Sequence, residues 1–484
     1  MAEWWRDAVF YEIYVRSFAD SDGDGVGDLH GIRTHLPYLP NLGVDALWLT
    51  PFYPSPGADH GYDVSDYVGV DPLFGTLADF DELVGAAHEL DLRVIVDIVP
   101  NHTSNAHPWF AGDRSRYVTV PDTGNGVPNN WPSTWGGPAW TLDAERGEYY
   151  LHLFAPEQPD LDWHQRQVRD DFDEILRFWL DRGVDGFRID VAHGLVKASS
   201  LDDEPEPIPA ARFSSDWRTA IDQPEVHDIY RDWRRLTGSY ESDRVLVGEV
   251  TFSDPARIAR YLRPDELHMG FNFSLVFQPW DATAIRTSVD ESLAALPVVT
   301  WVLENHDVTR LVTRFGAREA RAAALLLLAL PGPLFLYQGQ ELGLEEVDLP
   351  DELRQDPIFF RTRGARKGRD GCRLPLPWTR ELPARSWLPP PPHWSGLSVE
   401  AQLEDRESML ALYTAALHAR PTGAFRWLES AAGTLVFQRD DVVCAVNVDA
   451  ESLPLPDGEI LVASEPGFTD QLPPSSAAWV RLPA

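Results

Sequence analysis

Short apolar runs alternate along the chain with longer segments in which apolar residues recur every three or four positions. The runs are rich in β-branched and aromatic residues, as expected of buried strands, and the longer segments have the period of amphipathic helices. Eight runs are predicted to be strands: Val9–Tyr14, Val44–Leu49, Arg93–Ile98, Gly186–Asp190, Val245–Glu249, Gly270–Leu275, Val299–Leu303 and Leu334–Tyr337. Eight strands separated by helices most economically close into a parallel barrel, so we predict an α/β protein with a (β/α)8 TIM barrel.

Three helices are predicted with particular clarity. After the second strand, Thr76 and Asp79 have the spacing of a capping box and precede an apolar stripe. Before the fourth strand, a second stripe includes Phe172 and Trp179 and ends at Gly183. The segment Ala317–Leu330 is apolar nearly all round, which favours a helix packed between the barrel and a neighbouring layer.

The regular alternation is interrupted after the third strand and again near the end of the chain. Residues 101–163 are rich in Gly, Pro, Asn and Trp and predict an inserted subdomain, and Ala198–Pro224 reads as a polar loop. A last helix is expected over Val399–Ala419. The barrel is therefore assigned to residues 1–100 and 164–421.

The C-terminal part, residues 422–484, shows a different pattern. Its short alternating runs, such as Thr434–Gln438 and Val442–Asn447, predict a small antiparallel β domain. The two cysteines, Cys372 and Cys444, do not form a disulfide framework of the secreted kind.

Charge and composition narrow the class of partner. The chain has 41 Lys+Arg against 76 Asp+Glu, a net charge of −35, which disfavours nucleic acid and anionic lipid. A neutral sugar suits such a surface, and 18 Trp offer aromatic faces for sugar rings, although we expect most of them to serve packing. With neither a signal-peptide pattern nor an apolar stretch long enough to span a bilayer, the sequence predicts a soluble cytoplasmic protein. Its oligomeric state stays open.

Charged residues gather where the predicted strands end. Asp97 ends the third strand, Arg188 and Asp190 the fourth, and Glu249 the fifth, and Asp307 follows the seventh. In such a barrel the carboxyl ends of the strands carry the function. Glycosidic cleavage needs one carboxylate beside the anomeric carbon and one protonated acid at the leaving oxygen, and crowded carboxylates keep one of their number protonated. Arg188 shares a strand face with Asp190 and is expected to hold it ionised.

The sequence resembles the α-amylase superfamily of glycoside hydrolases, most of all its oligo-1,6-glucosidase and α-glucosidase branch. The motifs that carry the resemblance follow the family's order between Trp4 and about Trp378. They are D-I-V-P-N-H (97–102), G-F-R-I-D (186–190), G-E-V (248–250) and E-N-H-D (304–307), with G-Y-D-V-S-D-Y (61–67) and Q-P-D-L-D (158–162) in support.

The resemblance implies a role for each matching residue. Asp190 is the nucleophile, Glu249 the general acid/base, and Asp307 grips sugar hydroxyls in the transition state. The remaining expected substrate-binding residues are His102, Arg188, His306, Asp63 and Arg373, of which the last two are expected to pair and close the pocket. Asp66, in the same segment as Asp63, receives no defined role.

An acidic loop, D-S-D-G-D-G-V-G-D (20–28), suggests a second site. Carboxylates alternating with glycine suit a hard cation, and the family resemblance implies a structural Ca²⁺ in this loop, with Mg²⁺ left open. The expected ligands are Asp20, Asp22, Asp24, Asp28 and the carbonyl of Val26. The alternative is a solvated acidic turn.

Together these patterns predict a retaining, exo-acting α-glucosidase that releases terminal glucose from short oligosaccharides or α-glucosides. The alternative is a glucosyltransferase or isomerase, such as a trehalose synthase or sucrose-active enzyme, because transfer uses the same three carboxylates. Endo-acting amylases and non-catalytic transporter partners are disfavoured. Val191 resembles the residue of α-1,6-active members, but linkage preference stays open.

Overall fold

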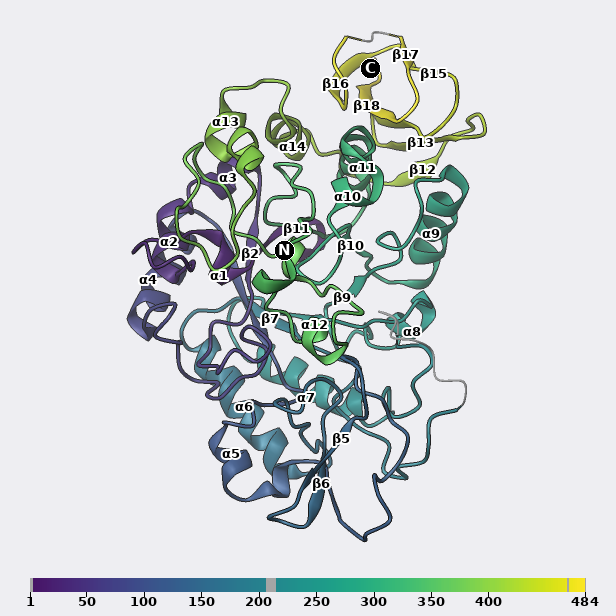
Figure 1. Cartoon of the computed structure of the whole chain (residues 1–484). Coiled ribbons are helices and arrows are strands. Elements are labelled where there is room, and N and C mark those ends of the chain that lie inside the picture. The colour runs from purple at the N-terminus through teal and green to yellow at the C-terminus, as the bar shows by residue number, and fades with distance from the viewer. Residues whose placement is uncertain (1–2, 206–214, 468–469, 484) are drawn as a thin grey trace.

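The chain closes eight parallel strands into a barrel, which lies at the centre of the molecule (Figure 1). The computed structural model describes residues 3–205, 215–467 and 470–483. In spatial order the strands are β1 (Val9–Ile13), β11 (Leu334–Tyr337), β10 (Thr300–Val302), β9 (Met269–Asn272), β8 (Val245–Gly248), β7 (Gly186–Ile189), β3 (Arg93–Ile98) and β2 (Ala46–Leu49). β1 pairs with both β11 and β2, which closes the ring and confirms the predicted barrel.

β3 and β11 have their predicted limits, the other strands differ by one to three residues at an end, and the largest difference is at β9. β9 begins one residue earlier than predicted and ends at Asn272, because the Asn272 side chain accepts a hydrogen bond from the Ser274 amide (3.1 Å) and turns the chain. The barrel interior holds aromatic side chains, among them the stacked pair Phe10 and Phe335 (4.4 Å between ring centroids), so it is a packed core.

Helices surround the barrel. α4 (Leu77–Glu89) begins with the predicted capping box of Thr76 and Asp79, and α6 (Arg166–Leu180) and α11 (Ala317–Ala329) bury the predicted apolar residues. The other helices are α1 (Val15–Phe18), α2 (Leu29–His35), α3 (Tyr38–Leu42), α5 (Pro108–Ala111), α7 (Val226–Thr237), α8 (Pro255–Ala259), α9 (Ala282–Ala295), α10 (Leu311–Phe315) and α12 (Pro357–Arg361). Short 3-10 turns lie at Trp4–Asp7, Arg114–Arg116, Asp351–Leu353, Asp370–Cys372 and Pro392–Leu397.

The segment between β3 and β7 forms a unit of its own beside the barrel. It contains a three-stranded antiparallel sheet in the order β4 (Thr119–Pro121), β6 (Glu148–Leu151) and β5 (Trp140–Asp143). A separate apolar cluster, which includes Trp131, Trp140 and Leu151, packs around this sheet. The unit extends away from the C-terminal sheet, toward the opposite end of the molecule (Figure 1).

The helix predicted over Val399–Ala419 is wrong as a single element. The structure has two helices, α13 (Val399–Leu403) and α14 (Met409–His418), separated by a polar turn. The break occurs because Ser408 caps the second helix, its hydroxyl accepting from the Ala411 amide (3.0 Å).

Beyond α14 the chain forms the predicted C-terminal antiparallel sheet. Its order is β12 (Phe425–Trp427), β13 (Thr434–Arg439), β14 (Val442–Asn447), β18 (Ser476–Arg481) and β16 (Glu459–Ala463), and β15 (Leu453–Pro454) pairs with β17 (Gln471–Leu472). The sheet packs on α11, where the Trp479 indole donates to the Leu325 carbonyl (3.1 Å). Cys372 and Cys444 are both buried free thiols. Within the described residues, every helix is too short or too polar to cross a bilayer.

Candidate active site

Neighbouring barrel strands deliver the carboxylates to one end of the barrel. Asp97 lies near the end of β3, Asp190 directly follows β7, and Glu249 directly follows β8. The backbone ladder sets their register, because the Asp190 amide donates to Ile98 and the Glu249 amide donates to Ile189 (both 2.9 Å). The carboxyl ends of parallel strands meet at the same rim, so these side chains gather there.

One guanidinium group joins the three carboxylates. Arg188, fully buried on β7, donates from Nη1 to Asp190 Oδ1 (2.7 Å) and to Asp97 Oδ1 (3.0 Å). Its Nη2 lies 2.9 Å from Glu249 Oε2. Arg188 therefore holds Asp190 and Glu249 next to each other at the rim, as the sequence predicted for Asp190.

The surroundings of Asp190 act on its charge in opposite directions. Burial raises the pKa of the Asp190 carboxyl well above its usual value, and Glu249 and Asp97 add to the rise, while Arg188 opposes it. Burial also raises the pKa of Asp97 to about 6, again against the effect of Arg188. For both Asp190 and Asp97, burial and the Arg188 charge therefore act on the pKa in opposite directions.

Asp307 has a contrasting environment. Its Oδ1 lies 2.7 Å from Arg373 Nη2 and 3.1 Å from Arg369 Nη1. Burial alone would raise the pKa of this carboxyl, but His306 and the two arginines lower it well below the usual range. Asp307 stays ionised and can accept hydrogen bonds from hydroxyl groups.

The predicted pairing of Asp63 with Arg373 is wrong. The buried Asp63 carboxylate accepts hydrogen bonds from Ser55 Oγ (2.8 Å) and from the amides of Ala58 and Asp59 (both 2.9 Å). These bonds stabilise the turn that precedes Asp63. Arg373 contacts Asp307 instead. Asp66 is exposed and accepts from the Val68 amide (2.9 Å).

Asp59 and Arg369 form the pair that sequence reasoning assigned to Asp63 and Arg373. Arg369 Nη2 lies 2.5 Å from Asp59 Oδ1, and its Nε lies 2.7 Å from Asp356 Oδ2. With its contact to Asp307, Arg369 links three carboxylates from three different loops. Asp59 lies four residues before Asp63, and Arg369 lies four residues before Arg373. No other feature of the sequence distinguished Asp59 or Arg369.

The two predicted histidines occupy different positions. His102 lines the cavity, and burial lowers its pKa to about 4, so it is neutral. His306 lies behind the cavity wall, where Nε2 contacts the Tyr62 hydroxyl (2.8 Å) and Nδ1 contacts Glu12. Burial lowers the His306 pKa as well. Both ring nitrogens of His102 already contact Asn101 and Tyr62, and His306 acts on the site through Tyr62 and Asp307.

Lys197 is a site residue that the sequence analysis missed. Its buried ammonium donates to Asn101 Oδ1 (2.7 Å) and lies 3.0 Å from Asp160 Oδ2, which joins the segment after β7 to both ends of the inserted unit. Asn101 in turn contacts His102 Nδ1 through its side-chain amide (3.0 Å). A usable signal existed, because Lys197 is one of only two lysines in the chain and follows an apolar run.

Some of these residues, with others from the inserted unit and nearby loops, line a cavity of about 680 Å³. Its inner end holds Asp59, Asp190, Glu249 and Asp307, and Arg369 joins two of them across it. The other lining residues, called the outer wall below, include Thr134, Trp135, Gly136, Phe154, Val191, Trp217, Arg218, Phe277, Thr309, Arg366 and Lys367. Val191 has a left-handed backbone (φ 46°), uncommon for a β-branched residue, and its amide donates to Glu249 Oε2 (3.0 Å).

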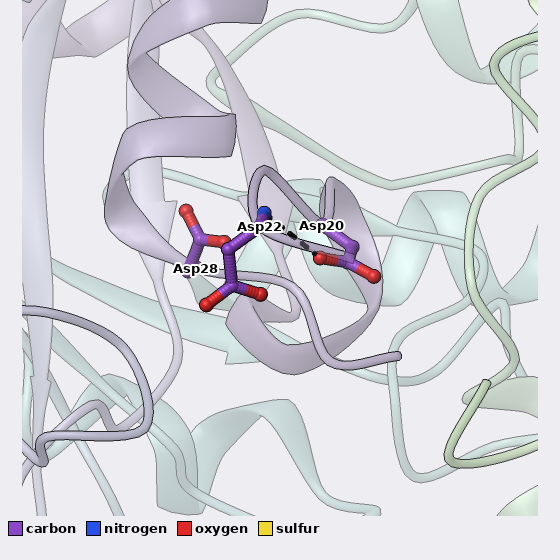
Figure 2. Close-up of side chains that lie close together, drawn as sticks. All are labelled: Asp20, Asp22 and Asp28. Atoms are coloured by element: carbon purple, nitrogen blue, oxygen red, sulfur yellow. Dashed lines mark hydrogen bonds between the residues drawn. The ribbon is translucent and has the colours of Figure 1, made fainter. Parts of the chain in front are cut away.

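The acidic loop lies apart from this cavity. Figure 2 shows Asp20, Asp22 and Asp28, whose nearest carboxylate oxygens all lie within 4.8 Å of one another. Asp24, expected as a fourth carboxylate ligand, lies outside this group, and its Oδ1 accepts from the Val26 amide (2.8 Å). Three of the four predicted carboxylates therefore come together.

The fold and the rim carboxylates agree with the comparison to known families. Residues 12–427 match the model of the α-amylase catalytic domain, and the chain belongs to this family of glycoside hydrolases. A probable α-glucosidase of Rhizobium meliloti is 38% identical, with 93% of this chain and 90% of the relative covered. An oligo-1,6-glucosidase of Parageobacillus thermoglucosidasius is 35% identical, with 86% and 83% covered. Among solved structures, the α-glucosyl transfer enzyme XgtA superposes with a TM-score of 0.90 at 38% identity, with 99% and 100% covered.

Proposed function

We propose that this protein is a retaining, exo-acting α-glucosidase that removes terminal glucose from short oligosaccharides or α-glucosides. The observation that carries the proposal is the contact of Asp190 and Glu249 with the same Arg188 guanidinium at the rim of the cavity. Retaining enzymes need their two carboxyl groups only about 5 Å apart, and one shared guanidinium favours such a separation.

The division of labour we propose is the one that the family resemblance implies, with Arg188 in contact with both carboxyl groups. Asp190, held by Arg188, attacks the anomeric carbon, and Glu249 gives a proton to the leaving oxygen and later takes one from the incoming water. Asp307, ionised between Arg369 and Arg373, accepts hydrogen bonds from sugar hydroxyls as positive charge develops on the ring. The neutral ring of His102 lines the same cavity.

The exo mode is supported by the inner end of the cavity. Arg369 joins Asp59 and Asp307 across it, so a chain of sugars has no exit in that direction. This end accommodates one terminal unit, which Asp59 and Asp307 can grip through its hydroxyl groups.

The test is the stereochemistry of the first product. Proton NMR during hydrolysis of maltose, isomaltose, sucrose and trehalose reports which anomer of glucose appears first and which linkage is cleaved fastest. We expect α-glucose to form before mutarotation, as double displacement requires. Initial release of β-glucose would overturn the assignment of Asp190 as nucleophile.

A second candidate is glucosyl transfer, favoured by the likeness to XgtA, which is described as an α-glucosyl transfer enzyme. Transfer and hydrolysis differ only in which acceptor reaches the covalent intermediate. Product analysis on concentrated maltose or sucrose separates them: hydrolysis gives two glucose per maltose, or equal glucose and fructose from sucrose, whereas transfer gives trisaccharides or an isomeric disaccharide.

We further propose that Asp20, Asp22 and Asp28 bind a structural Ca²⁺. Oxygens that share one Ca²⁺ at 2.3–2.6 Å lie at most about 5 Å apart, and these carboxylates meet that limit. The ion would offset the repulsion between the three charges and stabilise the loop before α2. Calorimetric titration of chelator-treated protein tests this, with Asp22→Asn expected to weaken binding and kcat expected to be unchanged by the metal.

A further inference from the structure

Two arginines on the outer wall of the cavity meet at one residue. Arg218, 8% exposed, lies between β7 and α7 and donates from Nη2 to Thr134 Oγ1 (3.1 Å) and to the Pro132 carbonyl (3.2 Å). Arg366, in the loop after α12, donates from Nη1 to the Thr134 carbonyl (3.3 Å). Both side chains line the cavity, so two cations from distant segments face its outer part together.

Neither of these cations forms an ion pair with a carboxylate in the described part of the chain, although Glu204 and Asp160 act on Arg218 from a longer distance and Asp356 acts on Arg366. All the hydrogen bonds of Arg218 and Arg366 there go to carbonyl or hydroxyl oxygens, and Arg218 Nη1 is buried without any partner. Arg369, deeper in the same cavity, contacts three carboxylates. In a chain with 76 acidic and 41 basic residues, two neighbouring unpaired arginines need a reason.

The electrostatic argument points to an anionic ligand group. Two like charges held near each other at a partly desolvated wall destabilise one another, and an anion between them offsets that repulsion. Burial lowers the pKa of Arg218 only to about 10, so the side chain is charged at neutral pH. The inner carboxylates Asp190, Glu249 and Asp307 repel an anion, which leaves the outer wall as its place.

We propose that the aglycone or acceptor of this enzyme carries an anionic group, a carboxylate or a phosphate, that binds against Arg218 and Arg366. This inference rests on the proposed α-glucosidase function and specifies its outer subsite. The glucosyl unit occupies the acidic inner end, and the anion occupies the basic outer wall. Lys367 lines the same wall but already contacts Asp351 (3.3 Å).

The experiment compares two α-glucosides that differ only in charge: the α-D-glucoside of 3-hydroxypropanoate and that of 3-hydroxypropanamide. Both have an aliphatic leaving oxygen and nearly the same size. We expect kcat/KM for the carboxylate to exceed that for the amide by about tenfold or more, the effect of one hydrogen bond to a charged group. The preference should shrink in 0.5 M NaCl, because salt screens exposed charges.

Variants assign the preference to the two arginines. Arg218→Gln and Arg366→Gln should each lower the carboxylate-to-amide ratio, and the double variant should bring it close to one. Arg361→Gln is the matched control, because Arg361 also donates to this segment, at the Gly136 carbonyl (2.6 Å), but does not line the cavity. Its ratio should equal that of the unmodified protein.

The possible outcomes separate this inference from the proposed function. Hydrolysis of both glucosides at equal kcat/KM, or equal losses on both in Arg218→Gln with the ratio unchanged, would overturn the anionic subsite and leave the glucosidase intact. Failure to cleave either of them, or maltose, isomaltose, sucrose and trehalose, would overturn the glucosidase itself. If Arg218→Gln does not fold, the exposed Arg366→Gln variant still decides the matter.

Discussion

The neighbours of Asp190 shift the pKa of its carboxyl group in opposite directions. Arg188 favours its ionised form, and burial together with Glu249 and Asp97 disfavours it. For Asp190 to act as the proposed nucleophile it must be ionised, and Arg188 is the neighbour that favours this form. The balance depends on three side chains from β3, β7 and β8, so each can be tested by single substitutions.

Asp190→Asn should lower kcat by roughly three orders of magnitude or more, because the amide cannot form the glycosyl ester. Arg188 can still donate to the amide oxygen, so the melting temperature measured by circular dichroism should change little. The matched control is Asp66→Asn, an exposed residue outside the cavity, which should retain normal kcat. Near-normal turnover by Asp190→Asn would refute its role.

Glu249→Gln should move the acid limb of the kcat/KM profile to lower pH. Glu249 raises the pKa of Asp190 through its negative charge, so removal of that charge lowers the pKa and ionises Asp190 at lower pH. The substrate must be α-glucosyl fluoride, whose leaving group needs no protonation. An acid limb that stays at the same pH or moves to higher pH would contradict the coupling of the two carboxylates.

At the residue scale, the sequence predicts that Asp190, Glu249 and Asp307 lie together. It assigns the ion pair at the inner end of the cavity to the wrong residues. Asp190, Glu249 and Asp307 each follow a barrel strand within a recognisable motif, and strand ends in a barrel share one rim. Asp59 and Arg369 are 310 residues apart. Asp63 lies four positions after Asp59, and Arg373 lies four positions after Arg369, so the sequence offers two carboxylates and two arginines for one ion pair. Only the folded turn, in which Asp63 accepts backbone hydrogen bonds, shows that Asp59 is the partner.

At the scale of elements, Lys197 joins the barrel to the inserted unit. Its ammonium lies between Asn101, at the start of that unit, and Asp160, near its end. The unit provides Trp135 and Phe154 to the cavity wall, so the position of this wall relative to Asp190 depends on the Lys197 contacts. A charge pair in such a place specifies geometry more than it contributes stability.

Lys197→Met should destabilise the protein by about 3–5 kcal/mol, because Asp160 is left as a buried carboxylate without its cation. The double variant Lys197→Met/Asp160→Asn should recover part of that loss, since no uncompensated charge remains. Urea unfolding measures both. Lys367→Met serves as the control and should stay within about 1 kcal/mol, as its ion pairs are exposed.

Element limits show where sequence patterns lose information. The apolar period continues through Val399–Ala419, but Ser408 caps a new helix there and splits the segment into α13 and α14. The spacing of apolar residues indicates which face of a helix is buried. It does not indicate where one helix ends and the next begins when both bury the same face. The loop Ala198–Pro224 is a similar case, and its residues 206–214 lie outside the described part of the chain.

The whole molecule determines the shape of the cavity. Its walls come from the barrel rim, the inserted unit and the loops after β7 and β11, joined by contacts such as Arg361 to Gly136 and Arg366 to Thr134. The eight strands could be predicted from local alternation alone. The cavity could not, because these contacts connect residues more than 220 positions apart.

With maltoheptaose as substrate, glucose and maltohexaose should be the only initial products. In the proposed exo mode, the Asp59–Arg369–Asp307 contacts block the inner end and a chain enters by its terminus. Chromatography at less than about a tenth of complete conversion tests this. Early appearance of maltose or maltotriose would show that the cavity opens at both ends, and Arg369→Ala is the variant expected to produce such a change.

The blocked inner end also sets an order of departure. In the exo-acting glucosidase proposed above, a glucosyl unit held there has the rest of the substrate between itself and the opening of the cavity, so the severed portion diffuses away before water can approach the covalent ester. Glucose is then the last molecule to go. Free glucose in the medium returns to the vacated inner position, which makes it a competitive inhibitor whose effect grows as the reaction proceeds.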